Sequence, residues 1–134
     1  MKEPPYQDAR VGLPRNFIQA CLLVLIAERP SHGYDLMERL SELGLPRPDP
    51  GSLYRTLRGL ERDRLVTSAW VDSASGPPRR TYRLSDEGRD WLHVLAGAHR
   101  ETRKILDRFL ERYEGLEHEL DELSASPPVE GELP

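Results

Sequence analysis

The stretch from Asp49 to Leu84 places the tightest limits on the fold of this chain. A proline-rich turn leads into a short helical pattern with four arginines, and two strand-like runs joined by Gly76-Pro77-Pro78 follow it. Proline disfavours the helical conformation in the residue before it, so these turns are marked in the sequence itself. The pattern predicts a rigid helix beside a basic hairpin, an arrangement that suits a DNA groove and the backbone next to it.

Length and composition allow one modest core. The chain has 134 residues, of which 37% are hydrophobic, enough for one domain with an appendage. The net charge of −4 argues against a uniformly basic nucleic-acid binder. The charge is polarised, however, because residues 14–84 hold 11 basic and 8 acidic side chains and residues 85–134 hold 6 and 13.

Cysteine content and hydropathy indicate a cytoplasmic protein. The single cysteine, Cys21, excludes an internal disulfide and a multi-cysteine metal site, which fits a reducing compartment. The longest apolar run, Ala20–Ala27, is far shorter than the ~20 residues of a membrane span. It does not resemble a signal peptide either, because 19 mostly polar residues precede it. We therefore expect no association with a membrane.

Two helices are predicted before the proline-rich turn. Residues 1–13 are interpreted as a flexible arm, and Asn16–Glu28 as a helix with Pro14 at its first turn. This helix is apolar on most sides, so it needs cover from more than one direction, and a second copy of the chain is one source of that cover. Ser31 is the predicted N-cap of the next helix and Gly44 its stop. The predicted buried side of that helix comprises Tyr34, Leu36, Met37, Leu40 and Leu43.

The third predicted helix, about Gly51–Arg64, separates an apolar face from a cationic one. On a helical wheel, one face carries Leu53, Leu57 and Leu60, and the opposite face carries Gly51, Arg55 and Arg62, flanked by Ser52, Arg58 and Gly59. Eight arginines and no lysine fall between residues 47 and 83, against four acidic groups. An ordinary solvated face is the simplest alternative, but this clustering favours contact with DNA.

A hairpin and a long helix complete the predicted order of elements. The hairpin has strands over Val66–Val71 and Arg80–Leu84, with a turn between them, and Ser85 is the N-cap of the last helix. Steps of three and four residues then give a mostly apolar row at positions 92, 95, 99, 102, 106, 109, 113, 116, 120 and 123. This row predicts a coiled-coil-like seam, with Gly97 and Gly115 as places where the helix can divide. The chain is thus predicted to be mainly α with a small β-hairpin: a winged helix-turn-helix followed by a long C-terminal dimerisation helix.

Three blocks of the sequence resemble the signature of PadR-type transcriptional regulators. They are His32-Gly33-Tyr34-Asp35-Leu36, then Pro50-Gly51-Ser52-Leu53-Tyr54-Arg55-Thr56-Leu57 with Leu60-Glu61, then Gly76-Pro77-Pro78-Arg79-Arg80-Thr81-Tyr82-Arg83-Leu84-Ser85-Asp86-Glu87-Gly88. The resemblance covers roughly residues 16–92 and implies a homodimeric prokaryotic repressor that an effector releases from DNA. The chain departs from the pattern at Arg55, where many relatives carry proline, and in its proline-heavy turn.

The candidate site residues follow from these patterns. The predicted DNA contacts are Ser52, Tyr54, Arg55, Arg58, Arg62, Arg79, Arg80 and Tyr82. The two tyrosines are predicted either to reach a phosphate or to pack. The predicted dimerisation residues are Leu92, Leu95, Leu106, Phe109, Tyr113, Leu116 and Leu120. Trp70 and Trp91 are candidates for an effector pocket, with core packing as the commoner alternative.

No catalytic or metal-binding constellation is recognisable in the sequence. The four histidines show neither the spacing of metal ligands nor a helical pair, and no Ser/His/Asp or phosphate-binding motif is present. We therefore expect a regulator without a cofactor, not an enzyme. Its partners would be a pseudo-palindromic operator, a second copy of the chain and a small-molecule effector, in the cytoplasm near the nucleoid. The alternative is a winged-helix module that binds an acidic protein.

The predicted domain boundaries follow the same elements. An arm over 1–13 precedes the DNA-binding domain, 14–84. The dimerisation region then covers 85–123, and residues 124–134 form a disordered tail, because they are rich in proline, glycine and glutamate.

Overall fold

The computed structural model describes residues 13–14 and 16–125. Its elements run in the order α1 (Phe17–Glu28), β1 (Ser31–His32), α2 (Gly33–Glu42), α3 (Pro50–Arg62), β2 (Val66–Ser73), β3 (Gly76–Leu84) and α4 (Asp86–Ala125). The predicted fold class is confirmed: a mostly helical chain with a small antiparallel sheet and a long C-terminal helix. The chain divides into two compact units, Met1–Leu95 and Ala96–Pro134. The predicted arm and tail lie almost entirely outside the described residues.

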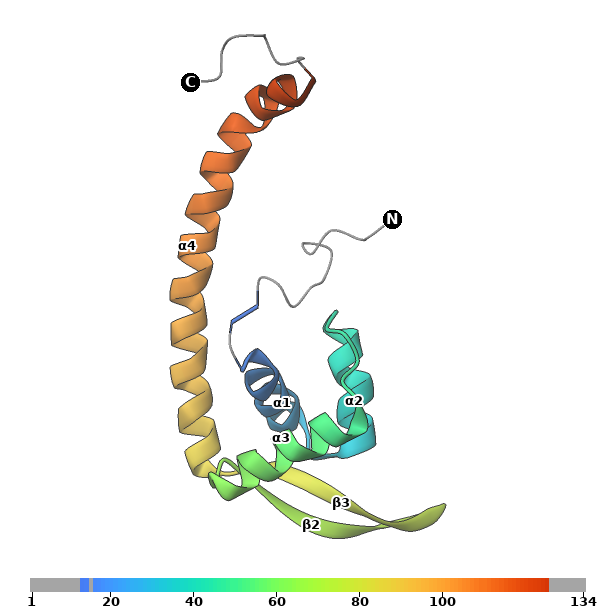
Figure 1. The fold of residues 1–134 in the computed structure, drawn as a ribbon. Helices are drawn as coiled ribbons and strands as arrows, with labels where there is room; N and C mark the ends of the chain where they lie inside the picture. Colours follow the sequence, from blue (N-terminus) through green and yellow to red (C-terminus); the bar gives the residue numbers. More distant parts are fainter. Residues whose placement is uncertain (1–12, 15, 126–134) are drawn as a thin grey trace. The chain divides into compact units, whose positions relative to one another are not determined.

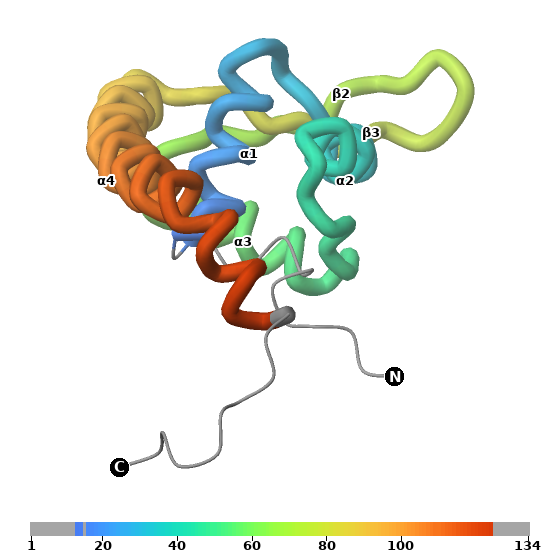
Figure 2. Tube along the Cα trace, turned by 90° about the horizontal axis from the view of Figure 1, so that it is seen from above, coloured from blue at the N-terminus to red at the C-terminus, as the bar shows by residue number. Residues whose placement is uncertain are grey.

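A three-stranded antiparallel sheet forms the base of the first unit. The strand order is β1-β3-β2, with Ser31 opposite Tyr82 and Val66 opposite Leu84. Figure 1 shows α1, α2 and α3 on one side of the hairpin formed by β2 and β3, and Figure 2 shows the tip of the hairpin projecting beyond them. The hairpin is therefore the wing of a winged helix-turn-helix.

The core of the first unit is closed largely by the chain itself. Six residues of α1 are buried, and the helix contacts both α2 and β3. Leu53, Leu57 and Leu60 of α3 are buried, as the helical wheel predicts. Cys21 is buried in the core, and this burial raises the pKa of its thiol. Most of the apolar surface of α1 therefore needs no second copy for its cover.

The start of α2 differs from the prediction. Ser31 is not the N-cap, because its backbone pairs with Tyr82 in β1, a strand that was not predicted. The cap is His32, whose Nδ1 accepts the backbone N–H of Asp35 at 3.2 Å. The Ser31 hydroxyl instead accepts a hydrogen bond of 2.6 Å from Arg39, which also donates to the carbonyl of Leu25 at 2.8 Å. This buried arginine ties the end of α1, β1 and α2 together.

The buried side of α2 is narrower than predicted. Leu36, Met37 and Leu40 are buried, but Tyr34 is 61% exposed and Leu43 is 53% exposed. Tyr34 is the second residue of the helix and Leu43 is its C-cap, so both lie at an end of α2. Gly44 has a φ of +88° and ends the helix, as predicted.

The turn and the wing are also shifted relative to the prediction. Asp49 caps α3, and the helix ends at Arg62 instead of Arg64, because Arg64 takes a left-handed φ of 63°. The hairpin turn is only two residues long, and Pro77 and Pro78 lie inside β3. The register shifts at this point, because Pro77 and Pro78 of β3 lie opposite a single residue of β2, Asp72. Prolines have no N–H to donate to a regular ladder, which fits their place at this bulge.

The last helix is continuous. Ser85 caps it, since its hydroxyl accepts the N–H of Gly88 at 2.9 Å, and it runs through Gly97 and Gly115 without a break. Leu92 and Leu95 pack against the core of the first unit, so the division between units falls within α4. Further along the helix, the exposed apolar residues are Ile105, Leu106, Phe109, Leu110, Tyr113, Leu116, Leu120 and Leu123. Within the described residues, no helix has the length and apolar character of a membrane span.

Candidate nucleic-acid interface

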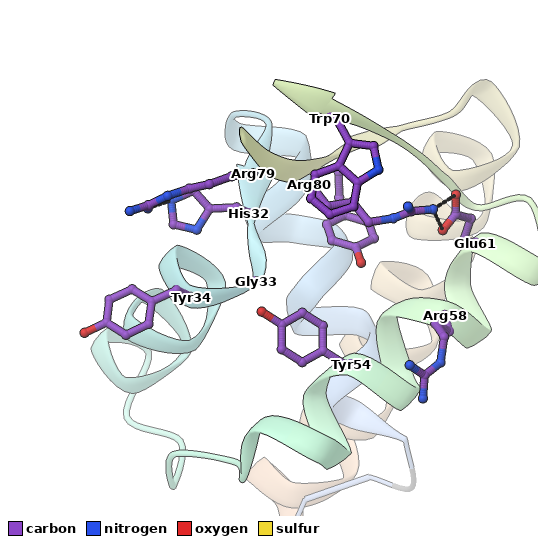
Figure 3. Close-up of a pocket in the computed structure, with 10 residues that line it drawn as sticks. His32, Gly33, Tyr34, Tyr54, Arg58, Glu61, Trp70, Arg79 and Arg80 are labelled. Atoms are coloured by element: carbon purple, nitrogen blue, oxygen red, sulfur yellow. Dashed lines mark hydrogen bonds and ion pairs between the residues drawn. The ribbon is translucent and has the colours of Figure 1, made fainter. Parts of the chain in front are cut away.

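A cleft of about 780 Å³ opens between the start of α2, α3 and the wing. It is lined by His32, Gly33, Tyr34, Tyr54, Arg58, Glu61, Trp70, Arg79, Arg80 and Tyr82 (Figure 3). Three of these residues are arginines and one is acidic. A concave, mainly cationic surface beside an exposed helix is the kind of surface that receives a nucleic-acid backbone.

The outer face of α3 is cationic and lies next to this cleft. Arg55 and Arg62 are exposed, and Arg55 Nη2 donates to the Ser52 hydroxyl at 3.1 Å. That hydroxyl donates in turn to Asp49 Oδ1 at 2.6 Å. These hydrogen bonds from the hydroxyl and backbone N–H of Ser52 hold the pKa of Asp49 below its ordinary value. The Ser52 hydroxyl therefore donates to the N-cap residue Asp49 and accepts from Arg55 at the same time.

Tyr54 points into the cleft from α3 and covers the first residue of α2. A Cβ atom placed on Gly33 would lie 2.7 Å from the Tyr54 ring and hydroxyl. Only glycine leaves room for this arrangement. Figure 3 shows the Tyr54 hydroxyl directed towards Gly33, with Arg58 further along the same helix. The side chain is 42% exposed, so it packs on α2 and still borders the cleft.

The two wing arginines have different surroundings. Arg79 and Arg80 are neighbours in β3 and both line the cleft, but they contact different elements. Arg79 Nη1 lies 2.8 Å from Nε2 of His32. A neutral imidazole accepts at one nitrogen only, and Nδ1 of His32 already faces the Asp35 N–H, so the ring satisfies only one of these donors. Arg79 is therefore open to a better acceptor.

Arg80 lines the cleft and pairs there with Glu61, while 44% of its side chain stays exposed. Its Nη2 lies 3.4 Å from Oε1 of Glu61 on α3, and its guanidinium carbon lies 5.8 Å from the centre of the Trp70 ring on β2. The Ser68 hydroxyl donates to the other oxygen of Glu61 at 2.6 Å. Glu61 thus connects α3 to both strands of the wing.

Two predicted site assignments need correction. Tyr82 is only 2% exposed and belongs to the core, and burial raises the pKa of its phenol. Of the two alternatives for this residue, packing is the one that the structure supports. Trp70 and Trp91 are 67% and 44% exposed, so the core alternative is wrong for both. Trp70 lines the cleft, whereas Trp91 is not among its lining residues, and an effector pocket at a dimer interface stays a prediction.

Four residues of the cleft were not assigned a role from the sequence: His32, Gly33, Tyr34 and Glu61. The first three lie just before or within the first turn of α2, so recognising His32 as the cap would have brought them together. Glu61 shares a side of α3 with Tyr54 and Arg58, which a helical wheel does show. No group of three or more His, Cys, Asp or Glu residues suited to a metal ion occurs in the described part of the chain.

Comparison with known proteins identifies relatives of this chain. The family model described as "Transcriptional regulator PadR-like family" matches residues 22–94, more than half of the chain. The structure of a PadR family transcriptional regulator from Eggerthella lenta is similar, with 30% identity and a TM-score of 0.63, over 72% of this chain and 84% of that one. A PadR-like transcriptional regulator from Bacillus cereus shares the fold at 23% identity, with a TM-score of 0.66 over 72% and 93% of the two chains. An uncharacterised protein of Lysinibacillus sphaericus is 25% identical over 107 residues, which are 78% of this chain and 98% of that protein.

Proposed function

The chain belongs to the PadR-like family of transcriptional regulators, and from this premise we propose that it is a homodimeric repressor of a pseudo-palindromic operator. Membership makes it a DNA-binding regulator and not an enzyme, in agreement with the prediction from sequence. The observation that carries the proposal is the cationic outer face of α3 beside the arginine-lined cleft. We place its action in the cytoplasm, at the nucleoid.

In this proposal α3 enters the major groove. Arg55 reads a base edge, because a guanidinium can donate two parallel hydrogen bonds to guanine. Ser52 orients Arg55 through the hydrogen bond described above. Arg58 and Arg62 then contact phosphates on either side of the groove, and these contacts set the register without reading sequence.

The wing rests on the backbone in the same proposal. Arg79 is the wing residue assigned to a phosphate, since its neighbour His32 does not satisfy it. The Tyr54 hydroxyl borders the same cleft and is assigned to a phosphate oxygen as well. Tyr82 is excluded from the interface by its burial.

The second copy is proposed to pack along α4. Leu106, Phe109, Tyr113, Leu116 and Leu120 follow the spacing of a coiled-coil seam and are exposed in the single chain. A two-fold dimer presents two copies of α3, so the half-sites of the operator should lie about one helical turn, roughly 10 base pairs, apart. Release by an effector requires that the effector prefer one arrangement of the two heads. Trp91, exposed on α4, is the aromatic residue proposed for that site.

A mobility-shift experiment tests the proposed function. Wild-type protein is titrated on its own upstream DNA and on a scrambled duplex of the same length, over a salt series. We expect tighter binding to upstream DNA, and Arg55→Ala should lower this preference by about 1–3 kcal/mol with little change on scrambled DNA. Arg103→Ala, on α4, removes the same charge outside the first unit and serves as the control.

Two outcomes would contradict the proposal. Equal affinity for both duplexes would remove sequence-specific regulation. Absence of binding to either duplex at low salt would favour the alternative that the cationic face meets an acidic protein.

A further inference from the structure

The single acidic residue among those that line the cleft is placed where DNA would approach. Glu61 lies on α3, on the side of the helix that faces the wing. A carboxylate on a surface that receives phosphates opposes binding by like-charge repulsion. Its presence therefore calls for a reason other than affinity.

The contacts of Glu61 supply that reason. One carboxylate oxygen accepts the Ser68 hydroxyl at 2.6 Å, a short hydrogen bond to an ionised acceptor. Both oxygens lie near Nη2 of Arg80, at 3.4 and 3.5 Å. Trp70 covers the same guanidinium at 5.8 Å. Arg80 is thus neutralised on one side and covered on another.

We infer that Glu61 determines specificity by holding Arg80 away from DNA. The inference rests on the proposed function and deepens it. A free arginine on the wing would add a phosphate contact to every DNA sequence equally, which raises non-specific affinity without improving discrimination. Paired with Glu61, Arg80 adds no such contact, and the wing relies on Arg79. The same pair also fixes the wing against the reading helix, so Glu61 is a positioning residue and not a contact with DNA.

Glu61→Gln is the informative substitution. The amide oxygen can still accept the Ser68 hydroxyl, but the charge that holds Arg80 is lost. Arg80 should then contact a phosphate and release about 0.9 more counterions per chain. With one such contact in each chain of the proposed dimer, the affinity for scrambled DNA should fall about 12-fold further than that of wild type between roughly 50 and 200 mM salt. At low salt the affinity for scrambled DNA should rise, and the ratio of operator to scrambled affinity should fall.

A double-mutant cycle assigns the effect to Arg80. Arg80→Gln in the wild-type background should leave the salt dependence unchanged. Arg79→Gln should instead reduce the slope of log affinity against log salt concentration by about 0.9 per chain. Glu61→Gln combined with Arg80→Gln should return the salt dependence to that of Arg80→Gln alone. Glu42→Gln, at the exposed end of α2, makes the same change of charge away from the cleft and should leave the salt dependence as in wild type.

Ser68→Ala distinguishes a purely structural role of Glu61 from its electrostatic hold on Arg80. This variant removes the hydrogen bond from the uncharged Ser68 hydroxyl to Glu61 and keeps the charge pair with Arg80, so we expect no steeper salt dependence. Circular dichroism of each variant at the assay temperature checks that it is folded. If Glu61→Gln and Ser68→Ala weaken operator binding alike with unchanged salt dependence, Glu61 only positions the wing, and the inference is overturned.

Other outcomes are equally decisive. A weaker salt dependence for Arg80→Gln alone would mean that Arg80 already contacts DNA in the complex, which also overturns the inference. The salt dependence of these variants is measured on scrambled DNA. Failure of the proposed function would instead appear as equal affinity of the wild-type protein for upstream and scrambled DNA. Absence of wild-type binding to both duplexes would overturn both.

Discussion

The two units of the chain use their apolar side chains in opposite ways. In the first unit, which ends at Leu95, residues such as Leu22, Leu36 and Leu57 are fully closed to solvent. In the second, every residue from Arg100 to Ser124 is exposed, including Phe109 at 63%. The first unit is therefore held by contacts within one chain, whereas the second presents an apolar row that such contacts leave uncovered. In the proposed dimer, the second copy therefore covers the long helix, whereas the first unit does not depend on it.

The contrast between the two units is tested most directly by placing a charge among the exposed apolar residues of α4. Phe109→Glu should prevent the proposed dimer, because a carboxylate in an apolar seam pays its desolvation without a partner. Losing the linked second head should weaken operator binding by about 100-fold or more. Light scattering and mobility shifts measure the two effects. Arg108→Glu introduces the same side chain outside the predicted row and should change neither mass nor affinity greatly; a dimer of unchanged mass for Phe109→Glu would contradict the assignment.

A cavity-forming substitution in the core tests whether the first unit is stabilised by contacts within one chain. Leu57→Ala should reduce the free energy of unfolding by about 2–5 kcal/mol, since a fully buried leucine leaves a void that relaxes only in part. Leu43→Ala makes the same change at a half-exposed position and should cost less than about 1 kcal/mol. Urea unfolding measures both. Equal losses for the two variants would mean that the burial described for this unit does not determine its stability.

The close contact between Gly33 and Tyr54 provides a test of the proposed contact between the Tyr54 hydroxyl and a phosphate. Gly33→Ala should displace the end of the Tyr54 ring, which is a flexible group, so the protein should remain folded. Operator affinity should fall by about tenfold or more, because a hydrogen bond to a charged group contributes roughly 1.5–3 kcal/mol. Tyr54→Phe, which removes only the hydroxyl, should produce a similar loss. Unchanged affinity for both variants would assign Tyr54 to packing alone.

The smallest expected effect concerns the cap of α3. The pKa of Asp49 is lowered in the folded protein, so its contribution to stability is present above the ordinary aspartate pKa and is lost as the pH falls through the folded value. Asp49→Asn keeps an acceptor for the Ser52 N–H but does not titrate, so its stability should depend less on pH in that acidic range. Thermal unfolding at several acidic pH values measures this, and identical pH profiles for the two proteins would contradict the assigned role.

Much of the first unit was predictable because its signals are local. The leucine face of α3 follows from its helical period, and the Ser85 cap follows from residue type and position. The strand β1 was missed because two residues show no period, and its existence depends on β3, which lies far away in the sequence.

The errors in the candidate site have related causes. Tyr82 stands between exposed arginines in the sequence, and its burial follows only from strand alternation with Leu84, which faces Val66 in the core. The different environments of Arg79 and Arg80 depend on His32 and Glu61, which belong to other elements. Residue type and local period carry no information about such partners.

The account depends most on two reading heads acting together on one operator. The mass of the full-length protein bound to a duplex with both half-sites, measured by analytical ultracentrifugation, tests this claim directly. Two chains per duplex are predicted, with the Phe109→Glu variant binding only weakly. A wild-type complex with one chain per duplex, at full operator affinity, would contradict the account.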